Sequence, residues 1–206
     1  NLVLKSLIVF QFALDAFFII LAFIQNSQVR LFTSQDLGYN DCNIVLIHTG
    51  GENTQKGKVF MDKIRQNKNI TGVAPRNFQS WITTVTVNGD VQLGPDMNVV
   101  DENFLSTLGL SLKEGRNFSA AYPADSTLSV MVNEAFVKEA GWKNAIGQNV
   151  KVMNRDPYNV VGVVKDYHFS SLYEKVRPQV FTCNNSYGGR STFYIRLGGN
   201  DVPLVL

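Results

Sequence analysis

The chain has 206 residues, of which 17% are charged, and a net charge of +2, so it is long enough for one domain or for two small lobes that share a core. The Lys and Arg residues are scattered and form no run of five like charges, which excludes a basic nucleic-acid arm and an acidic tail. Cys42 and Cys183 lie outside any C-x-x-C spacing, which argues against zinc and a redox pair. We expect two buried free thiols, and a disulfide between them stays open.

The first element is an apolar helix over residues 7–24, LIVFQFALDAFFIILAFI. It contains no Pro or Gly and is long enough to cross most of a hydrocarbon core of about 30 Å. No small-residue cleavage site follows, so a membrane span is favoured over a signal peptide. A buried hairpin helix and an uncleaved anchor stay open as alternatives.

The polar residues of this helix lie on one stripe. Positions 11, 15, 18, 22 and 25 recur at steps of four and three, which places them on one face of a helix. An aspartate in mid-span costs about 2.5 to 3.5 kcal/mol on insertion scales, so the stripe should face other helices. The predicted membrane-helix contacts are Gln11, Asp15, Ala22 and Gln25.

The helical pattern continues beyond the span, through QNSQVRLFTSQDL, to a C-terminal cap at Gly38. From position 7 to position 37 the helix would measure roughly 45 Å at about 1.5 Å per residue. Residues 1–38 are therefore predicted to form a transmembrane helix and a stiff stalk. Such a rod could pass displacement from the membrane to the domain that follows.

Residues 43–95 predict a strand, a helix, a returning strand and a hairpin. The run 43–49 is β-rich, 53–68 has apolar residues at helical spacing, and 70–75 reads as the returning strand. Between 80 and 95, two strands flank Asn88-Gly89-Asp90, and Asn and Gly tolerate the positive φ angles of a tight hairpin.

The second half predicts an α+β domain. A strand and a short helix capped near Asp101 lead to a turn through Gly115. The strand 129–132 is followed by a helix with Asn133 as its N-cap and Gly141 as its stop. Further strands are expected near 149–153, 158–164, 178–184 and 191–199. We expect short helices on one side of mixed sheets.

Known catalytic and cofactor patterns fail on their spacing. GGENTQKGK, which follows a strand, has five residues between Gly51 and Gly57 instead of four, and Val59 stands where a Walker A motif needs Ser or Thr. His48 and His168 lie in no metal-binding spacing. Neither Ser170 nor Cys183 sits in a nucleophile elbow. We therefore expect no enzyme activity, no metal and no cofactor.

The cluster Lys165, Asp166 and His168 follows an apolar strand and could form an acid–base site. Alternation would place Asp166 and His168 on one face, but no third reacting group is visible. The favoured interpretation is a structural turn in which Asp166 binds backbone amides and His168 packs against neighbouring rings.

Several segments, in this order, resemble the extracytoplasmic core domain of MacB/FtsX-type ABC transporter permeases of Gram-negative bacteria. They are LIVFQFAL, DLGYNDCNIVLI, LGLSLKEGRNFS, VMVNEAFVKEAGWKNAIGQNV and VVGVVKDYHFSSLYEKVRPQVF. The resemblance implies structural turns at Gly141, Gly147, Gly162, Asp166 and His168. It also implies two lobes: a porter-like β-α-β lobe from 43–79 and 153–206, and an inserted β-rich lobe over 80–152, within a core domain spanning 39–206.

By this resemblance, a cytoplasmic ABC ATPase would drive the permease, which would sit in the inner membrane with this domain facing the periplasm. Further partners would be a second permease copy or half, and an outer-envelope partner or periplasmic cargo; nucleic acid is not expected. The work would be export of a drug or peptide, lipoprotein release or hydrolase activation. The ends of the chain lead us to expect a piece of a longer polypeptide. A sensor ectodomain on a single anchor is the main alternative, and a pilin-like protein fits less well because the acid lies too deep in the helix.

Overall fold

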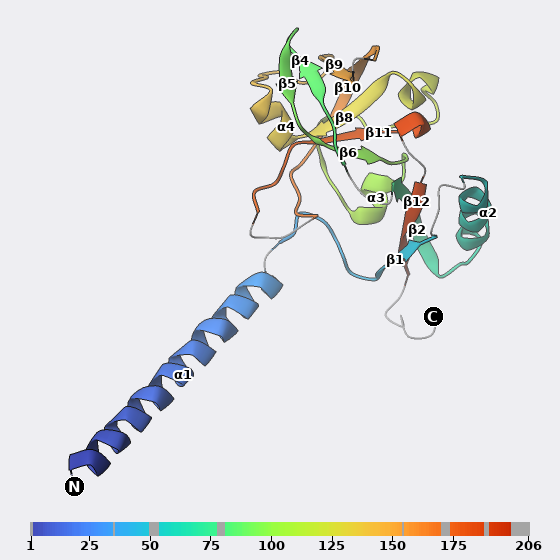
Figure 1. Ribbon diagram of the computed structural model, residues 1–206. Coiled ribbons are helices and arrows are strands. Elements are labelled where there is room, and N and C mark those ends of the chain that lie inside the picture. Colours follow the sequence, from blue (N-terminus) through green and yellow to red (C-terminus); the bar gives the residue numbers. More distant parts are fainter. Residues whose placement is uncertain are drawn as a thin grey trace. The chain divides into compact units, whose positions relative to one another are not determined.

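The computed structural model describes residues 2–34, 36–49, 54–77, 81–153, 155–169, 174–187 and 190–198. The chain divides into two compact units, Asn1–Leu37 and Gly38–Leu206. The first unit is a single helix and the second is a domain of strands and short helices (Figure 1). Each unit is described by itself.

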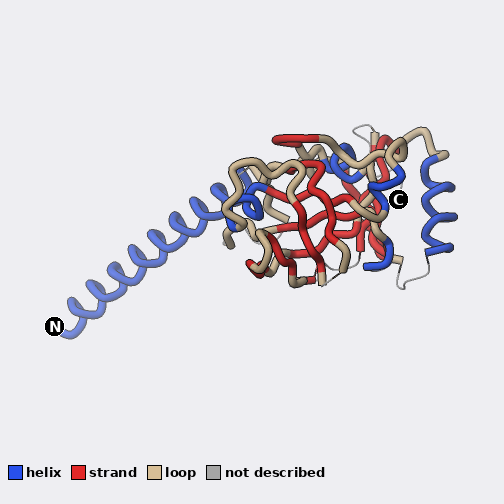
Figure 2. The backbone as a smooth tube through the Cα atoms, turned by 90° about the horizontal axis from the view of Figure 1, so that it is seen from above, coloured by secondary structure: helices blue, strands red, loops and turns tan. Residues whose placement is uncertain are grey.

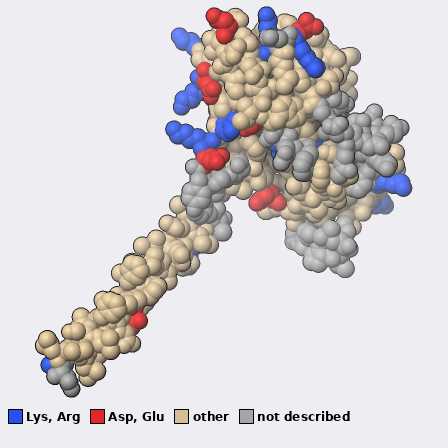
Figure 3. Space-filling model, viewed as in Figure 1, with Lys and Arg blue, Asp and Glu red and all other residues tan. Residues whose placement is uncertain are grey.

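Helix α1 spans Leu2–Ser34. By length and composition, Leu2–Leu31 is apolar enough to cross a membrane, and its surface is almost free of charged groups (Figure 3). The predicted continuation of this helix to position 37 is wrong, because α1 ends at Ser34. The polar run Thr33 to Asp36 explains this end, since Ser, Thr and Asp favour caps and turns over helix interiors. The helix therefore ends three residues earlier than expected, and its role as a stalk stays a prediction.

In the described part of the domain there are twelve strands and three α-helices. The helices are α2 Thr54–Arg65, α3 Phe104–Leu108 and α4 Glu134–Glu139, with 3₁₀ turns η1 Pro123–Ser126 and η2 Asn185–Tyr187. The strands are β1 Ile44–His48, β2 Ile70–Asn77, β3 Trp81–Ile82, β4 Val85–Val87, β5 Val91–Leu93, β6 Asp96–Val99, β7 Leu112–Gly115, β8 Ser129–Asn133, β9 Asn149–Val152, β10 Pro157–Val164, β11 Gln179–Thr182 and β12 Arg190–Leu197.

The strands form two sheets. The small sheet has the order β1-β12-β2 and is antiparallel throughout, with α2 packed against β2 and β12. The large sheet has the order β3-β6-β11-β8-β10-β9-β4-β5, with β7 pairing to β10. Its pairs β10–β8 and β11–β6 are parallel and the others antiparallel, so the predicted mixed sheet is confirmed. Figure 2 shows these strands as the centre of the domain, with α2 at its edge.

Strand pairing differs from the expected lobe division in one respect. Of the strands after position 153, β12 alone pairs with β1 and β2, whereas β10 and β11 pair with strands of 80–152. The reason is apolar burial, because Val160 and Val180 belong to the same cluster as Val130 and Val132. The two-lobe organisation stays a prediction, and β10 and β11 belong with the larger sheet.

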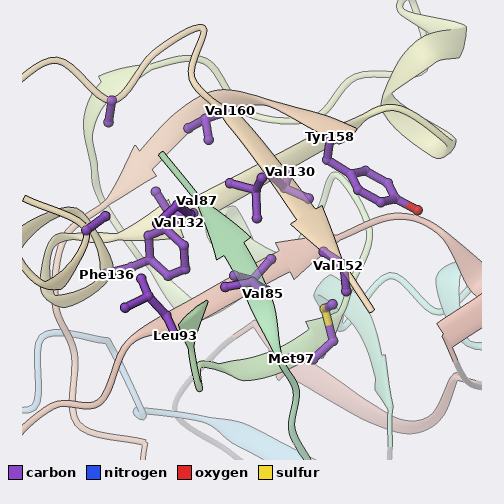
Figure 4. Packing of buried hydrophobic residues seen from close by; sticks show 14 of the residues in the cluster. Val85, Val87, Leu93, Met97, Val130, Val132, Phe136, Val152, Tyr158 and Val160 are labelled. Carbon is purple, nitrogen blue, oxygen red and sulfur yellow. The ribbon is translucent and has the colours of Figure 1, made fainter. Parts of the chain in front are cut away.

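The main core lies on one face of the large sheet. Valines from β4, β8, β9 and β10 surround Phe136 of α4, and Met97 closes one end (Figure 4). A second cluster on the sheet's other side centres on Phe104 and Phe181, and a third, smaller one fills the small sheet around Phe193. Apolar burial is thus concentrated in the large sheet.

Local signals in the sequence predicted several elements correctly. The hairpin β4–β5 turns through Asn88 and Gly89, both at positive φ. Asn133 caps α4 by accepting a hydrogen bond from the Phe136 N–H. The short helix α3 is different, since its N-cap is Asn103 and Asp101 instead accepts from the Asn103 N–H.

Candidate functional site

The segment 38–43, called the junction segment below, is where the chain enters the domain. The Asn40 N–H donates to the Leu108 carbonyl at 2.9 Å. One guanidinium then holds the segment: Arg196 of β12 donates from Nη2 to the Asn40 carbonyl at 2.8 Å, from Nη1 to the Cys42 carbonyl at 3.1 Å, and from Nε to the Thr107 carbonyl at 2.7 Å. The rigid donor fork of arginine therefore ties the junction segment to the small sheet and to α3.

Aromatic packing holds the other side of the junction segment. The Tyr39 and Tyr167 rings lie 6.2 Å apart edge to face, and Tyr167 stacks on Phe181 of β11 at 6.4 Å. Burial raises the pKa of the Tyr167 hydroxyl, so it stays neutral. Gly38 has φ +79°, and a Cβ there would lie 2.9 Å from the Asp166 carbonyl oxygen. Glycine is thus required for this close approach.

Asp166 connects the turn after β10 to the start of α4. Its Oδ1 accepts from Asn133 Nδ2 at 2.8 Å and from the Ala135 N–H at 3.0 Å, and its own N–H donates to Glu134 at 3.1 Å. Lys113 Nζ lies 2.7 Å from the same Glu134 carboxylate. The carboxylate that could have served as a base is therefore engaged in capping a helix. This geometry supports the predicted structural turn.

The electrostatics of this corner follow from burial and neighbouring groups. Burial raises the pKa of the Asp166 carboxyl and Glu134 adds to this, while the Ala135 and Asn133 hydrogen bonds oppose it. Lys113 holds the pKa of Glu134 below its usual range. His168 is half-buried and lines the same open depression as Asp166 and Lys175. A role for His168 stays a prediction.

The remaining predicted site residues fall into two groups. Gly141 and Gly147 have φ of +68° and +83° in turns, and a Cβ at Gly162 would lie 2.4 Å from the Arg116 carbonyl oxygen, where β10 meets the end of β7. The membrane-contact residues Gln11, Asp15, Ala22 and Gln25 all lie in α1 and are exposed in its unit. The functional roles of both groups stay predictions.

Three arrangements were missed by the sequence reasoning. One is the Arg196 anchor. Another is Asn77, whose side chain accepts from the Val99 N–H at 2.8 Å and donates to the Met97 carbonyl at 3.4 Å, so it joins β2 to β6. The third is the bidentate pair of Arg116 with Asp125, at 2.6 and 2.8 Å. The sequence offered a signal for the first arrangement, because Arg196 lies between the apolar residues Ile195 and Leu197 in a predicted strand, where a charged side chain needs a partner.

The expectations for cysteine, metal and phosphate sites have different outcomes. Cys42 is exposed and Cys183 half-buried, so the prediction of two buried thiols is wrong, and the two do not form a disulfide with each other. Within the described ranges no group of three His, Cys, Asp or Glu residues could hold a metal ion. The phosphate-loop candidate begins at positions 50–53, outside the described residues, and Ser170 lies outside them too.

Solved structures with this fold are extracytoplasmic regions of ABC transporters and a permease domain. The periplasmic region of MacB from Actinobacillus actinomycetemcomitans aligns over 77% of this chain and 76% of its own, with a TM-score of 0.59 and 17% identity. The extracellular domain of the noncanonic ABC-type transporter YknZ from Gram-positive bacteria aligns over 77% of this chain and 86% of its own, with a TM-score of 0.58 and 11% identity. A domain of a putative permease protein from Porphyromonas gingivalis aligns over 68% of this chain and 61% of its own, with a TM-score of 0.52 and 13% identity. At these identities the likeness establishes the fold.

These structures establish the fold, and the family follows from the sequence itself. The family model of the MacB-like periplasmic core domain matches residues 13–202. The chain belongs to the MacB-like periplasmic core domain family, which is a family of ABC transporter permease domains. No curated protein sequence matches it. The YknZ structure shows that the fold is not confined to Gram-negative bacteria.

Proposed function

We propose that this chain is the mechanically driven extracytoplasmic part of an ABC transporter permease in the inner membrane. In this proposal α1 spans the membrane and meets a second permease copy or half along Gln11, Asp15, Ala22 and Gln25. The domain faces the periplasm, and a cytoplasmic ABC ATPase supplies the energy. The chain itself carries out no catalysis. The apolar length of α1 and the family membership support this arrangement.

The observation that carries the proposal is the anchoring of the junction segment. The chain passes from α1 to the domain through residues 35–38, and residues 38–43 are tied to β12 and α3 by Arg196 and to the turn after β10 by Tyr39. A displacement that reaches Gly38 is therefore passed to both sheets. A freely hinged attachment would lose that displacement, because flexible chain transmits little force.

The external work is one of three kinds: export of a drug or peptide, release of a lipoprotein, or activation of a cell-wall hydrolase, with an outer-envelope partner or periplasmic cargo. The charges on the face seen in Figure 3 have both signs interspersed and favour none of these. The shared step in all three is movement of the domain when ATP binds. That step is the one to test.

The test uses the whole permease that contains this chain, reconstituted with its ATPase. A donor dye is placed at Lys151→Cys, an exposed position of β9, in a background with Cys42→Ser and Cys183→Ala, and the acceptor is in the lipid. We expect energy transfer to change between the ADP and ATP states. In Arg196→Met this change should fall by at least about half while ATP hydrolysis persists, since three hydrogen bonds to the junction segment and α3 are lost.

The matched control is Arg155→Met, an exposed arginine stacked over Tyr187 in the large-sheet region. It should leave the ATP-dependent change intact. A domain whose position is insensitive to ATP in the unmodified permease would contradict the proposal. Stabilisation by a small metabolite in place of any ATP response would favour the anchored sensor.

A further inference from the structure

A polar cavity of about 460 Å³ lies beside the small sheet. Its walls come from β2, β12 and α3, together with Arg65, the last residue of α2. Among the residues that the structure describes, the lining contains two arginines and no carboxylate. It is separate from the depression at Asp166 and His168.

The two arginines differ in their partners, since Arg65 forms an ion pair with Asp101 and Arg196 does not bind a carboxylate in the ion pairs of the described residues. Arg196 donates to backbone carbonyls, and no ion pair recorded among the described residues includes it. Arg65 has Asp101 Oδ2 at 3.6 Å, well beyond the 2.7 to 2.9 Å of a charge-assisted hydrogen bond. Asp101 lies outside the lining, so the described lining itself carries two positive charges, of which that of Arg65 is offset only by this long ion pair.

Thr107 supplies an independent sign of a ligand. Its side chain is 2% exposed, yet its Oγ1 has no hydrogen-bond partner among the described residues. Buried hydroxyls almost always have a partner. Gly72 also lines the cavity and packs close to this hydroxyl, because a Cβ there would lie 3.0 Å from Oγ1. A donor is thus held at the wall of a cationic cavity.

We propose that this cavity binds an oxyanion group, a phosphate or a carboxylate. The guanidinium of Arg65 would form a two-point contact with the oxygens, the spare N–H groups of Arg196 would donate from the opposite wall, and Thr107 Oγ1 would donate a third hydrogen bond. The ligand would contact the same arginine that anchors the junction segment. The site goes beyond the proposed function, since anion binding requires neither the ATPase nor movement.

The experiment follows thermal unfolding of the full 206-residue chain in detergent. Sodium phosphate and sodium acetate are titrated in separate arms, each against sodium chloride of equal ionic strength. A ligand that binds only the native state raises Tm in proportion to the occupancy of its site. We expect a saturable rise in at least one arm, and the arm with the larger rise identifies the group.

Two variants and one control locate the site. Arg65→Gln and Thr107→Val should each weaken binding at least about fivefold. Thr107→Val keeps the side-chain shape and removes an unpaired buried hydroxyl, so the variant should fold. Lys151→Gln removes one exposed positive charge outside the cavity and should bind like the unmodified chain. Arg196 is left unchanged because it also holds the junction segment.

The proposal is overturned by the absence of a saturable rise in both arms, or by unmodified binding in either cavity variant. A loss in Lys151→Gln equal to that in Arg65→Gln would also overturn it, because it would indicate nonspecific charge screening. These thermal unfolding experiments are carried out without ATP. Failure here therefore leaves the proposed function standing, and the energy-transfer test can fail without affecting this site.

Discussion

The two sheets of the domain are stabilised differently. The large sheet packs buried valines from six strands, β4, β6, β8, β9, β10 and β11, into one cluster with Phe136, and has a second apolar cluster on its other side. Among the described residues, the small sheet's own cluster contains four buried apolar residues, Val73, Phe193, Ile195 and Leu197. Directed hydrogen bonds from Arg196 and Asn77 join the small sheet to the junction segment and to the large sheet. The large sheet is thus held by apolar packing, whereas directed hydrogen bonds join the small sheet to its neighbours.

The largest expected effect comes from removing one phenyl ring in each sheet. Phe136 is 0% exposed and Phe193 is 1% exposed. Phe136→Ala should lower the free energy of unfolding by about 4 kcal/mol, because its fully enclosed site cannot collapse. Phe193→Ala should cost about 3 kcal/mol, since partly buried Val45, Met61 and Ile64 can move into the space. Guanidinium denaturation followed by circular dichroism measures both.

Leu128→Ala is the control for these two substitutions, because Leu128 is 51% exposed and should change stability by less than about 0.5 kcal/mol. Circular dichroism is chosen over fluorescence, because Phe136 packs 5.6 Å from Trp142 and its loss would alter the signal directly. An equal or larger cost for Phe193→Ala would refute the claim that the large sheet is the more firmly packed.

The next effect concerns the buried ion pair beside the large sheet. The Asp125 side chain is 4% exposed, and Arg116 binds it through two hydrogen bonds. Arg116→Met should cost about 3 kcal/mol at pH 7, because a buried carboxylate loses its cation. Asp125→Asn in the same chain should recover part of this loss. A double variant as unstable as Arg116→Met alone would contradict the pairing.

The same pair predicts a pH dependence. Burial opposes ionisation of Asp125, but the hydrogen bonds from Arg116, Ser129 and Ser119 hold its pKa below the usual value. A lowered folded-state pKa stabilises the native chain above about pH 4, the unfolded value, and this contribution is lost as the pH falls through the folded value. The stability difference between the unmodified chain and Arg116→Met should therefore shrink as the pH falls from 7 to 3.5, because Asp125 protonates more readily once Arg116 is gone. Denaturation at pH 7, 5 and 3.5 measures it.

Sequence reasoning succeeded where the signal is local. Asn88-Gly89 fixes a hairpin by its φ angles, and Asn133 and Gly141 mark the two ends of α4 within nine residues. It failed where the partner is distant along the chain. The Arg196 anchor joins residues more than 150 positions apart, and β10 pairs with β7, β8 and β9 at once. A valine-rich strand does not specify which neighbours it will have.

The smallest effect tests the coupling between the sheets. Asn77→Leu keeps the side-chain volume but leaves the Val99 N–H and Met97 carbonyl without this partner, which should cost about 2 kcal/mol. Asn77→Asp keeps the acceptor for Val99 and loses the donor to Met97, so its cost should be intermediate. Hydrogen exchange of backbone amides reports where the loss occurs.

If Asn77 couples the sheets, exchange in Asn77→Leu should accelerate most in β2 and β12 while the amides of β8 and β10 keep their protection. The small sheet would then open as a separate unit, because its own apolar cluster is too small to hold it against the large sheet once the bridging amide is lost. Uniform acceleration across both sheets would mean that they unfold as one cooperative unit. That result would refute the claim that Asn77 couples two separately opening sheets.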